Sequence, residues 1–415
     1  MEVKNSAKKS LATNTIMLYV LTFSNYIFSF LTVPYQTRVL GPEIYGILGF
    51  AFATMVYFQL VMDFGFTLSG TAEIAQNRND KEKLAVITEA IIVGKIFLFV
   101  ICAVVIFIMT TFIKQFSQDS IIFGICFIYT FMNSLIPDFL YRGLEVMTPI
   151  TYRTVLIKLI FTIGVFVFVK KPSDYLWIPI LYLVGSLVAV VFAYVDSYRR
   201  FKLPIVKITK KDVFDRLHEA FPFFVSRIAS TVYGATNTLL LGLKFSGQSV
   251  MGFYSSADKV VQLARMGASP IADSLYPYMI ANKDFKLVKK LLSIFMPIII
   301  LGSGVLFVFA PEICVVVFGQ GYEAAAGPLR ALMPVVILVL PTYIFGFPVM
   351  TPLGIAKHAN IAVIYGAIIQ IVLLAILWFT GKFGLISICI ATSITELCVF
   401  LYRIIMVIRT VKKNK

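Results

Sequence analysis

The amino-acid sequence predicts an all-α integral membrane protein of about twelve transmembrane helices. Of its 415 residues, 59% are hydrophobic and only 14% are charged, whereas soluble domains are about 45–50% apolar and about 25% charged. Apolar stretches of the roughly 20 residues that a helix needs to cross a bilayer recur along the whole chain. Little chain remains for a soluble catalytic domain, so the composition favours a protein that is not an enzyme.

The expected spans fall into two sets of six. The first set lies near residues 14–34, 44–69, 85–111, 120–141, 151–169 and 174–195. The second set lies near residues 217–243, 250–280, 288–310, 325–347, 359–379 and 384–406. The stretch at 14–34 is full length and lacks a small-residue cleavage site, so we expect a spanning helix there and not a signal peptide.

Lys and Arg are concentrated in every second connection between spans and in both tails. Because these residues are retained on the cytoplasmic side of a membrane, the pattern predicts that both termini lie in the cytoplasm. The same residues account for the net charge of +16. Contact with anionic membrane lipids explains them, so no nucleic-acid partner is expected.

The longest polar connection, Asp196 to Leu217, divides the chain almost in half. We therefore expect a six-helix bundle at residues 1–197, a basic cytoplasmic linker at 198–216 and a second bundle at 217–415.

An internal repeat supports this division. A shift of 206 positions places Gly41 and Gly46 on Gly247 and Gly252, and a V-M-T-P sequence at 146–149 recurs at 349–352. Repeats of six helices enter the membrane in the same orientation, so the bundles should be related by a pseudo-two-fold axis along the membrane normal. This is typical of transporters, with a central path between bundles that rock against each other.

Charged residues inside the spans should face the protein interior, because a charge at the bilayer centre costs upwards of ~2.5 kcal/mol. Arg and Lys in such a cavity would suit a substrate that carries phosphate. The candidate substrate-binding residues are Lys95, Arg227, Lys259, Gln262 and Arg265. The alternative is that these charges pair with one another, for example Arg265 with Asp258, and hold helices together.

Carboxylates at membrane depth are candidates for coupling transport to H⁺ or Na⁺. They are Asp63, Asp273 and Glu396, and the alternative for each is an interhelical hydrogen bond or ion pair. No metal or other cofactor is expected, because the five cysteines lie in apolar runs without a C-x-x-C pair and the chain has only two histidines. The absence of a G-x-x-x-x-G-K-[ST] sequence argues against an ATP-driven pump.

Several motifs resemble those of one transporter family. N-Y-I-F-S-F-L-T-V-P-Y-Q-T-R-V-L-G-P-E-I-Y-G at 25–46, D-F-G-F-T at 63–67 and A-E-I-A at 72–75 resemble the amino-terminal signature of Wzx-type O-antigen flippases. The resemblance continues at 252–259 (G-F-Y-S-S-A-D-K), 275–277 (L-Y-P) and 319–325 (G-Q-G-Y-E-A-A), so it covers nearly the whole chain. It places the chain in the polysaccharide branch of the multidrug/oligosaccharidyl-lipid/polysaccharide exporters.

The resemblance implies that an undecaprenyl-pyrophosphate-linked oligosaccharide repeat unit is moved from the cytoplasmic to the periplasmic face of the inner membrane by alternating access. The product would be O-antigen or a related surface polysaccharide, and the polymerase and chain-length regulator of that pathway are candidate partners. Two alternatives stay open at this stage: a membrane glycosyltransferase or polysaccharide polymerase, and an ion-coupled drug antiporter of the same superfamily.

Overall fold

The computed structural model describes residues 2–413, apart from the side chains of residues 2–16, 18–23, 25, 26, 29, 229, 230, 232 and 233. Among the described residues the secondary structure is helical throughout, without strands. The chain forms two compact units. The first unit comprises Met1–Leu40 and Ala51–Thr231, and the second comprises Gly41–Phe50 and Val232–Lys415.

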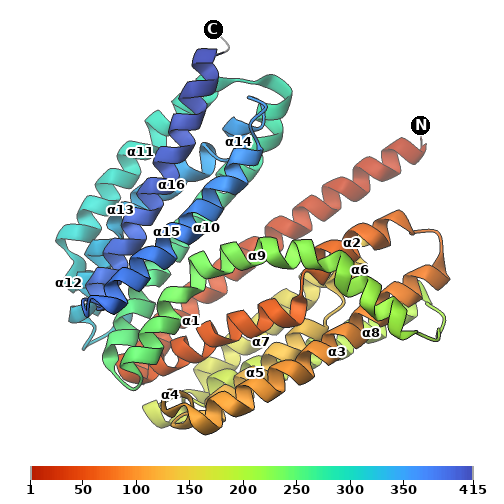
Figure 1. Ribbon diagram of the computed structural model, residues 1–415, viewed down its shortest axis with the longest axis horizontal. Helices are drawn as coiled ribbons and strands as arrows, with labels where there is room; N and C mark the ends of the chain where they lie inside the picture. The colour runs from red at the N-terminus through yellow and green to blue at the C-terminus, as the bar shows by residue number, and fades with distance from the viewer. Residues whose placement is uncertain (1, 414–415) are drawn as a thin grey trace. The chain divides into compact units, whose positions relative to one another are not determined.

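The first unit is built from long helices joined by short turns. Its helices are α1 (Glu2–Asp63, except residues 41–50), α2 (Phe66–Gln76), α3 (Lys81–Phe112), α4 (Lys114–Ser117), α5 (Ser120–Leu135), α6 (Asp138–Gly143), α7 (Thr148–Phe168), α8 (Trp177–Phe201) and the first part of α9 (Lys210–Phe245). Helix α8 packs against both α5 and α7, and α5 also contacts α3. Figure 1 shows these helices running alongside one another.

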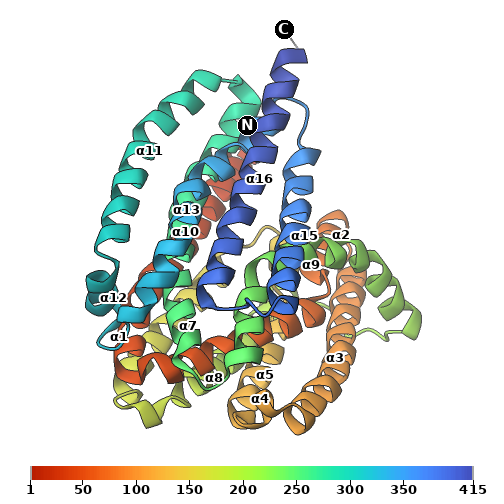
Figure 2. The ribbon, with the colours of Figure 1, turned by 60° about the vertical axis from the view of Figure 1, so that its left-hand side comes forward.

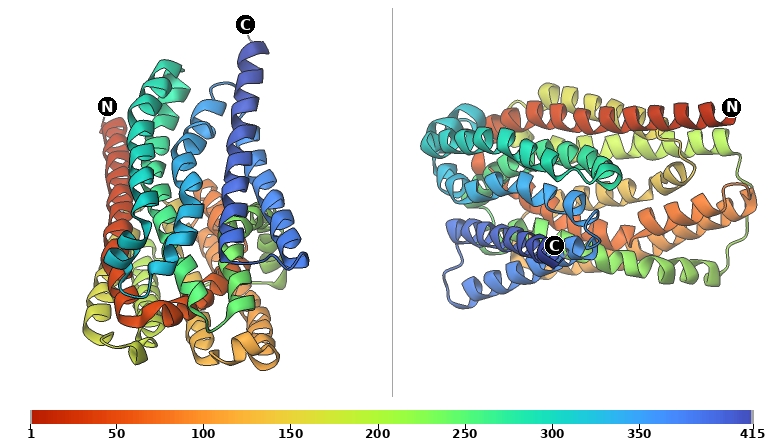
Figure 3. Two further views of the ribbon diagram at one scale, coloured as in Figure 1. Left: turned by 90° about the vertical axis from the view of Figure 1, so that its left-hand side faces the viewer. Right: turned by 90° about the horizontal axis from the view of Figure 1, so that it is seen from above.

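Helix α1 contains both of the first two expected spans, because the chain continues from one to the other without a loop. The break is a single residue, Gly41, whose φ of 74° lies in the left-handed region that glycine adopts without steric cost. On either side of it, the segments 2–40 and 51–63 run in different directions (Figure 3). The second span ends earlier than expected, at Asp63, and α2 follows it after a sharp turn.

The second unit contains the remaining helices. They are the second part of α9, α10 (Ser249–Asn282), α11 (Phe285–Val308), α12 (Ala310–Phe318), α13 (Ala326–Ile344), α14 (Phe347–Met350), α15 (Lys357–Phe379) and α16 (Leu385–Lys413). Helix α13 packs against α10, α11 and α16, and α15 packs against α16 (Figure 2).

A hydrogen-bonded polar network lies buried in the second unit and joins α9, α10, α15 and α16. The Gln370 side chain donates to the Asn237 side-chain oxygen at 2.8 Å and accepts from the Thr395 hydroxyl at 2.7 Å. The Asn237 amide donates in turn to the hydroxyls of Thr392 and Tyr254, at 2.8 and 3.0 Å. Because each of these five side chains takes part in a hydrogen bond, the network can hold four helices in register at membrane depth.

Nine segments of the described residues are long and apolar enough to cross a membrane. Their outer faces expose large apolar side chains, such as Phe107, which is 67% exposed, and Leu301, which is 72% exposed. Exposed apolar surfaces of this extent are stable in contact with lipid and unfavourable in contact with water. Helices α9 and α10 are 36 and 34 residues long but carry more polar residues, so the total of twelve spans stays a prediction.

The internal repeat has a local counterpart in the backbone. Gly41 and Gly247, which the shift of 206 aligns, have φ values of 74° and 72°, and each precedes a helical segment. Equal backbone conformation explains why glycine occurs at both positions. The pseudo-two-fold relation between the bundles stays a prediction.

Candidate functional site

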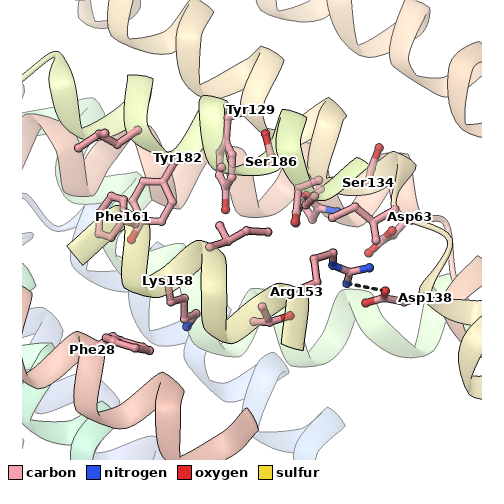
Figure 4. A pocket seen from close by; sticks show the side chains of 18 of the residues that line it. Phe28, Asp63, Tyr129, Ser134, Asp138, Arg153, Lys158, Phe161, Tyr182 and Ser186 are labelled. Carbon is pink, nitrogen blue, oxygen red and sulfur yellow. Dashed lines mark hydrogen bonds and ion pairs between the residues drawn. The ribbon is translucent and has the colours of Figure 1, made fainter. Parts of the chain in front are cut away.

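A cavity of about 300 Å³ lies inside the first unit, among α1, α3, α5, α7 and α8. Its charged lining residues are Asp63, Lys95, Asp138, Arg153 and Lys158. Its aromatic lining residues are Phe28, Tyr129, Phe161 and Tyr182. Figure 4 shows that Asp63, Asp138 and Arg153 lie toward one end of the cavity, and that Phe161 and Tyr182 lie toward the other.

Asp63 is held between two cations at the charged end. The Lys95 ammonium lies 3.4 Å from one carboxylate oxygen of Asp63 and the Arg227 guanidinium lies 3.7 Å from the other. Lys95 also donates to the backbone carbonyl of Ser134 and is only 2% exposed. Lys95 and Arg227, which were predicted to bind substrate, therefore both contact Asp63, which was predicted to couple transport to an ion.

The turn at 63–65 explains how Asp63 comes to face the cavity. Helix α1 ends at Asp63, and the next two residues have positive φ values, 40° at Phe64 and 81° at Gly65. A Cβ at Gly65 would lie only 2.7 Å from the carbonyl oxygen of Ala220, so α9 packs directly on this turn. The ring of Phe64 stacks on Phe224 with centroids 4.4 Å apart, which holds an aromatic residue in a backbone conformation it rarely adopts.

A second ion pair lines the cavity beside the first. Arg153 donates to Asp138 at 2.7 Å and is only 6% exposed. Arg153 was not among the predicted site residues, and it lies inside α7, about one turn after the helix begins. Its partner Asp138 begins α6.

Lys158 occupies the middle of α7 and is half-buried in the cavity wall. Within the described part of the chain it makes no hydrogen bond or ion pair, in contrast to Lys95 and Arg153. The cavity lining contains three cations and two carboxylates, so Lys158 is its surplus positive charge.

The other three predicted substrate residues lie on α10 in the second unit. The ammonium of Lys259 donates to the Gln262 side chain at 3.1 Å, and Gln262 donates to Asp258 at 2.6 Å. Arg265 lies 3.7 Å from Glu396, which is buried. The three predicted residues therefore lie on one helix, and Arg265 pairs with Glu396, whereas the sequence suggested Asp258.

Asp273, the last of the predicted ion-coupling residues, lines a separate open hollow of about 520 Å³ in the second unit. Its carboxylate accepts a hydrogen bond from Ser269 at 2.9 Å, one helical turn away. Tyr276, Tyr343 and Arg403 line the same hollow. Among the described residues no three His, Cys, Asp or Glu side chains lie together as a metal site would require.

The aromatic end of the cavity was not predicted from the sequence. Tyr129 is on α5, Phe161 on α7 and Tyr182 on α8, and each lies in an apolar run where an aromatic residue reads as a core or lipid-facing side chain. The charges of Asp138, Arg153 and Lys158, together with those of Asp63 and Lys95, could indicate an interior cavity from the sequence, but not its aromatic end.

Comparison with known proteins agrees with this architecture. A family model described as "Polysaccharide biosynthesis protein" matches residues 11–283. A "Putative O-antigen transporter" of Escherichia coli (strain K12) is 28% identical over 98% of this chain and 99% of its own length. A "Putative O-antigen transporter" of Shigella dysenteriae is 25% identical over 94% of this chain and 98% of its own length.

Two solved structures share the fold. "Lipid II flippase MurJ, inward closed conformation" superposes with a TM-score of 0.73 at 15% identity, over 95% of this chain and 87% of its own. An outward-facing multidrug resistance MATE family transporter of the MOP superfamily has a TM-score of 0.56 at 16% identity, over 98% and 97% of the two chains. The family model covers well over half of the sequence, and the family indicated by the motifs is thereby confirmed: the chain belongs to the polysaccharide biosynthesis protein family.

Proposed function

We propose that this protein is a flippase that moves an undecaprenyl-pyrophosphate-linked oligosaccharide from the cytoplasmic to the periplasmic leaflet of the bacterial inner membrane by alternating access. Family membership and the two O-antigen transporter relatives, which align over nearly their whole length, support a role in polysaccharide export. The shared fold with a lipid II flippase supports the same type of movement.

The observation that carries the proposal is a polar, charge-lined cavity inside a bundle whose outer surface is apolar. Sugars and phosphates cannot cross hydrocarbon unaided, because each unsatisfied polar group costs several kcal/mol there. A membrane helix bundle with an internal polar cavity removes much of that cost. The lipid tail can stay in the bilayer while the head group passes through the protein.

The cations have different roles in this proposal. Lys158 can donate to the head group directly, because no carboxylate among the described residues pairs with it. Arg227, Lys259, Gln262 and Arg265 are proposed to contact the pyrophosphate. Lys95 already donates hydrogen bonds to Asp63 and to the backbone of Ser134. Its proposed role is therefore to position the Asp63 carboxylate.

Coupling to H⁺ or Na⁺ is proposed to act through the paired carboxylates. Neutralising Asp63 would remove the charge that attracts Lys95 and Arg227. Neutralising Glu396 would do the same for Arg265. Either event would make cations available to an anionic head group, so that ion binding and substrate binding are linked.

The likeness to a multidrug transporter also keeps drug export as a second candidate. A cationic drug requires uncompensated carboxylates, whereas both carboxylates that line the cavity are paired with Lys or Arg. The charge balance of the cavity therefore favours a neutral or anionic head group.

The test is translocation in liposomes that contain the purified protein and lipid-linked oligosaccharide in both leaflets. Membrane-impermeant periodate oxidises sugar diols on the outside only, so liposomes without active protein should lose about half of the intact lipid. We expect nearly complete oxidation with wild-type protein and slower oxidation with Lys158→Met. Oxidation that stops at half with well-folded wild-type protein would overturn the flippase assignment, and proton-driven uptake of a cationic dye instead would support drug export.

A further inference from the structure

We propose that the aromatic end of the first-unit cavity is a subsite for a sugar ring of the head group. This inference rests on the proposed flippase function and names which part of the substrate the cavity takes. The subsite consists of Tyr129, Phe161 and Tyr182, and the side chains of Gln59 and Asn133 line the same cavity.

The aromatic side chains hold one another in place. Phe161 and Tyr182 stack with ring centroids 4.1 Å apart, and Tyr129 lies against Tyr182 with centroids 5.3 Å apart. Phe52, which does not line the cavity, packs edge-on against Tyr182 with ring centroids 5.3 Å apart. Rings packed in this way lose little freedom when a ligand binds, so they form a preorganised wall.

A pyranose ring matches such a wall because one of its faces carries mainly C–H groups. That face packs on the electron-rich face of an aromatic ring, while the hydroxyls at the sugar's edge still need hydrogen-bond partners. Pockets that bind small polar ligands combine these features: an apolar or aromatic wall and a few well-placed polar groups.

The polar groups that a sugar requires are present. The hydroxyl of Tyr129 points into the cavity (Figure 4) and has no hydrogen-bond partner among the described residues. Gln59 and Asn133 make one long contact with each other, at 3.5 Å, so both amides keep capacity to donate and accept. At membrane depth a polar group without a partner is costly, and sugar hydroxyls would satisfy all three side chains.

The other parts of the substrate fit this cavity less well. A lipid tail would leave Tyr129 and the two amides without partners. A pyrophosphate would meet three cations, of which Lys95 and Arg153 are already neutralised by carboxylates, so Lys158 alone among the lining residues would balance its charge. The volume of about 300 Å³ is at the lower end of the range for small-molecule pockets, so it suits one or two sugar rings and not a whole repeat unit.

The experiment compares two lipids on the purified full-length protein: bare undecaprenyl pyrophosphate, and undecaprenyl pyrophosphate that carries one N-acetylglucosamine. Equilibrium binding of each is measured for wild type, Tyr182→Leu, Tyr182→Phe and Tyr129→Phe. The control is Trp177→Leu, since Trp177 stacks on Phe168 between the same two helices, α7 and α8, but does not line the cavity.

We expect wild type to prefer the sugar-bearing lipid. Tyr182→Leu should weaken binding of that lipid by about tenfold and leave the bare lipid unchanged, whereas Tyr182→Phe should retain the preference. Tyr129→Phe should lose about threefold or more, again for the sugar-bearing lipid alone. Trp177→Leu should bind both lipids as wild type does.

Two results would overturn the subsite while leaving the flippase standing. They are equal binding of both lipids by wild type, and equal loss of both in Tyr182→Leu. If Tyr182→Leu is too unstable to purify, Tyr129→Phe decides, and an unchanged preference in that variant overturns the subsite. Wild-type protein that binds neither lipid contradicts the proposed function itself.

Discussion

Two ion pairs of the first unit show how burial changes the effect on stability of removing one partner. Lys95 is 2% exposed and lies 3.4 Å from Asp63, whereas Arg78 and Glu145 form a close pair whose side chains are about half exposed. Exposed pairs contribute about 0–1 kcal/mol, but removing one partner of a buried pair leaves an uncompensated charge and costs about 3–5 kcal/mol.

Replacing Lys95 with Met should therefore destabilise the protein by about 3–5 kcal/mol. Thermal unfolding in detergent would measure this loss. The double variant Lys95→Met/Asp63→Leu should recover a large part of it, because it removes both buried charges, and Arg227, the other cation beside Asp63, has a side chain that is 41% exposed. Arg78→Met should change the stability by about 1 kcal/mol or less, and a similar loss in Arg78→Met and Lys95→Met would contradict the assignment of Lys95 to a buried pair.

Close helix packing in the second unit depends on glycine at one position of α10. Gly252 faces the start of the segment 41–50, and a Cβ there would overlap the carbonyl oxygen of Pro42. Gly267 lies on the same helix, but no described atom outside the helix's own backbone comes within 4 Å of the place where its Cβ would be. The two glycines therefore provide a matched test of packing within one element.

Gly252→Ala should destabilise the protein by about 1–3 kcal/mol, because a backbone atom must move to admit the methyl group. Gly267→Ala should be neutral or stabilising by up to about 1 kcal/mol, since alanine is the better helix former. Thermal unfolding of both variants in one detergent makes the comparison. Equal effects would show that α10 does not approach Pro42 as closely as described here.

The start of α9 is stabilised by a reciprocal cap outside the membrane-spanning segments. The Thr209 backbone N–H donates to the Asp212 carboxylate at 2.8 Å, and the Asp212 N–H donates to the Thr209 hydroxyl at 3.2 Å. The hydrogen bond from the Thr209 hydroxyl is the main reason that the pKa of Asp212 lies below its ordinary value. The cap therefore contributes stability above the ordinary pKa of about 4 and loses it as the pH falls through the lowered value.

We expect the first turn of α9 to lose amide hydrogen-exchange protection as the pH is lowered from 6 to about 3. Protection factors, which correct for the intrinsic exchange rate, are the measurement. Asp212→Asn should show weaker protection of this turn at pH 6 and little change with pH. A wild-type turn that is equally protected at both pH values would argue against a charged cap.

The orientation of the whole molecule in the membrane follows from its charge distribution. The basic residues in the first turns of α1, in the connection that leads into α9 and at the end of α16 all belong to the predicted cytoplasmic side. Green fluorescent protein fused after Lys415 should therefore fluoresce, since it folds in the cytoplasm, and alkaline phosphatase fused there should be inactive. Active phosphatase with a dark fluorescent fusion would place the C-terminus on the outer face and require an odd number of spans.

Part of the candidate site could be predicted from sequence. Asp63 and Lys95 were identified because a charge in an apolar run has few explanations other than an interior contact. Arg153 was not identified, although it lies inside the span expected at 151–169, because its position near the end of that span is also typical of a residue at the membrane surface. Tyr129 and Tyr182 could not be distinguished from the other aromatic residues of a membrane protein, since their chemistry is compatible with core, cavity and lipid.

Composition and local motifs were enough to identify a helical membrane protein of the polysaccharide biosynthesis family, because both can be recognised without knowing how the helices pack. The packing of the helices was needed to show which charges meet: Lys95 with Asp63, Arg153 with Asp138, and Arg265 with Glu396. It also decided that three aromatic residues from three helices share one cavity. Periodicity shows which face of a helix turns inward, but the partner across that face is set by how the helices pack.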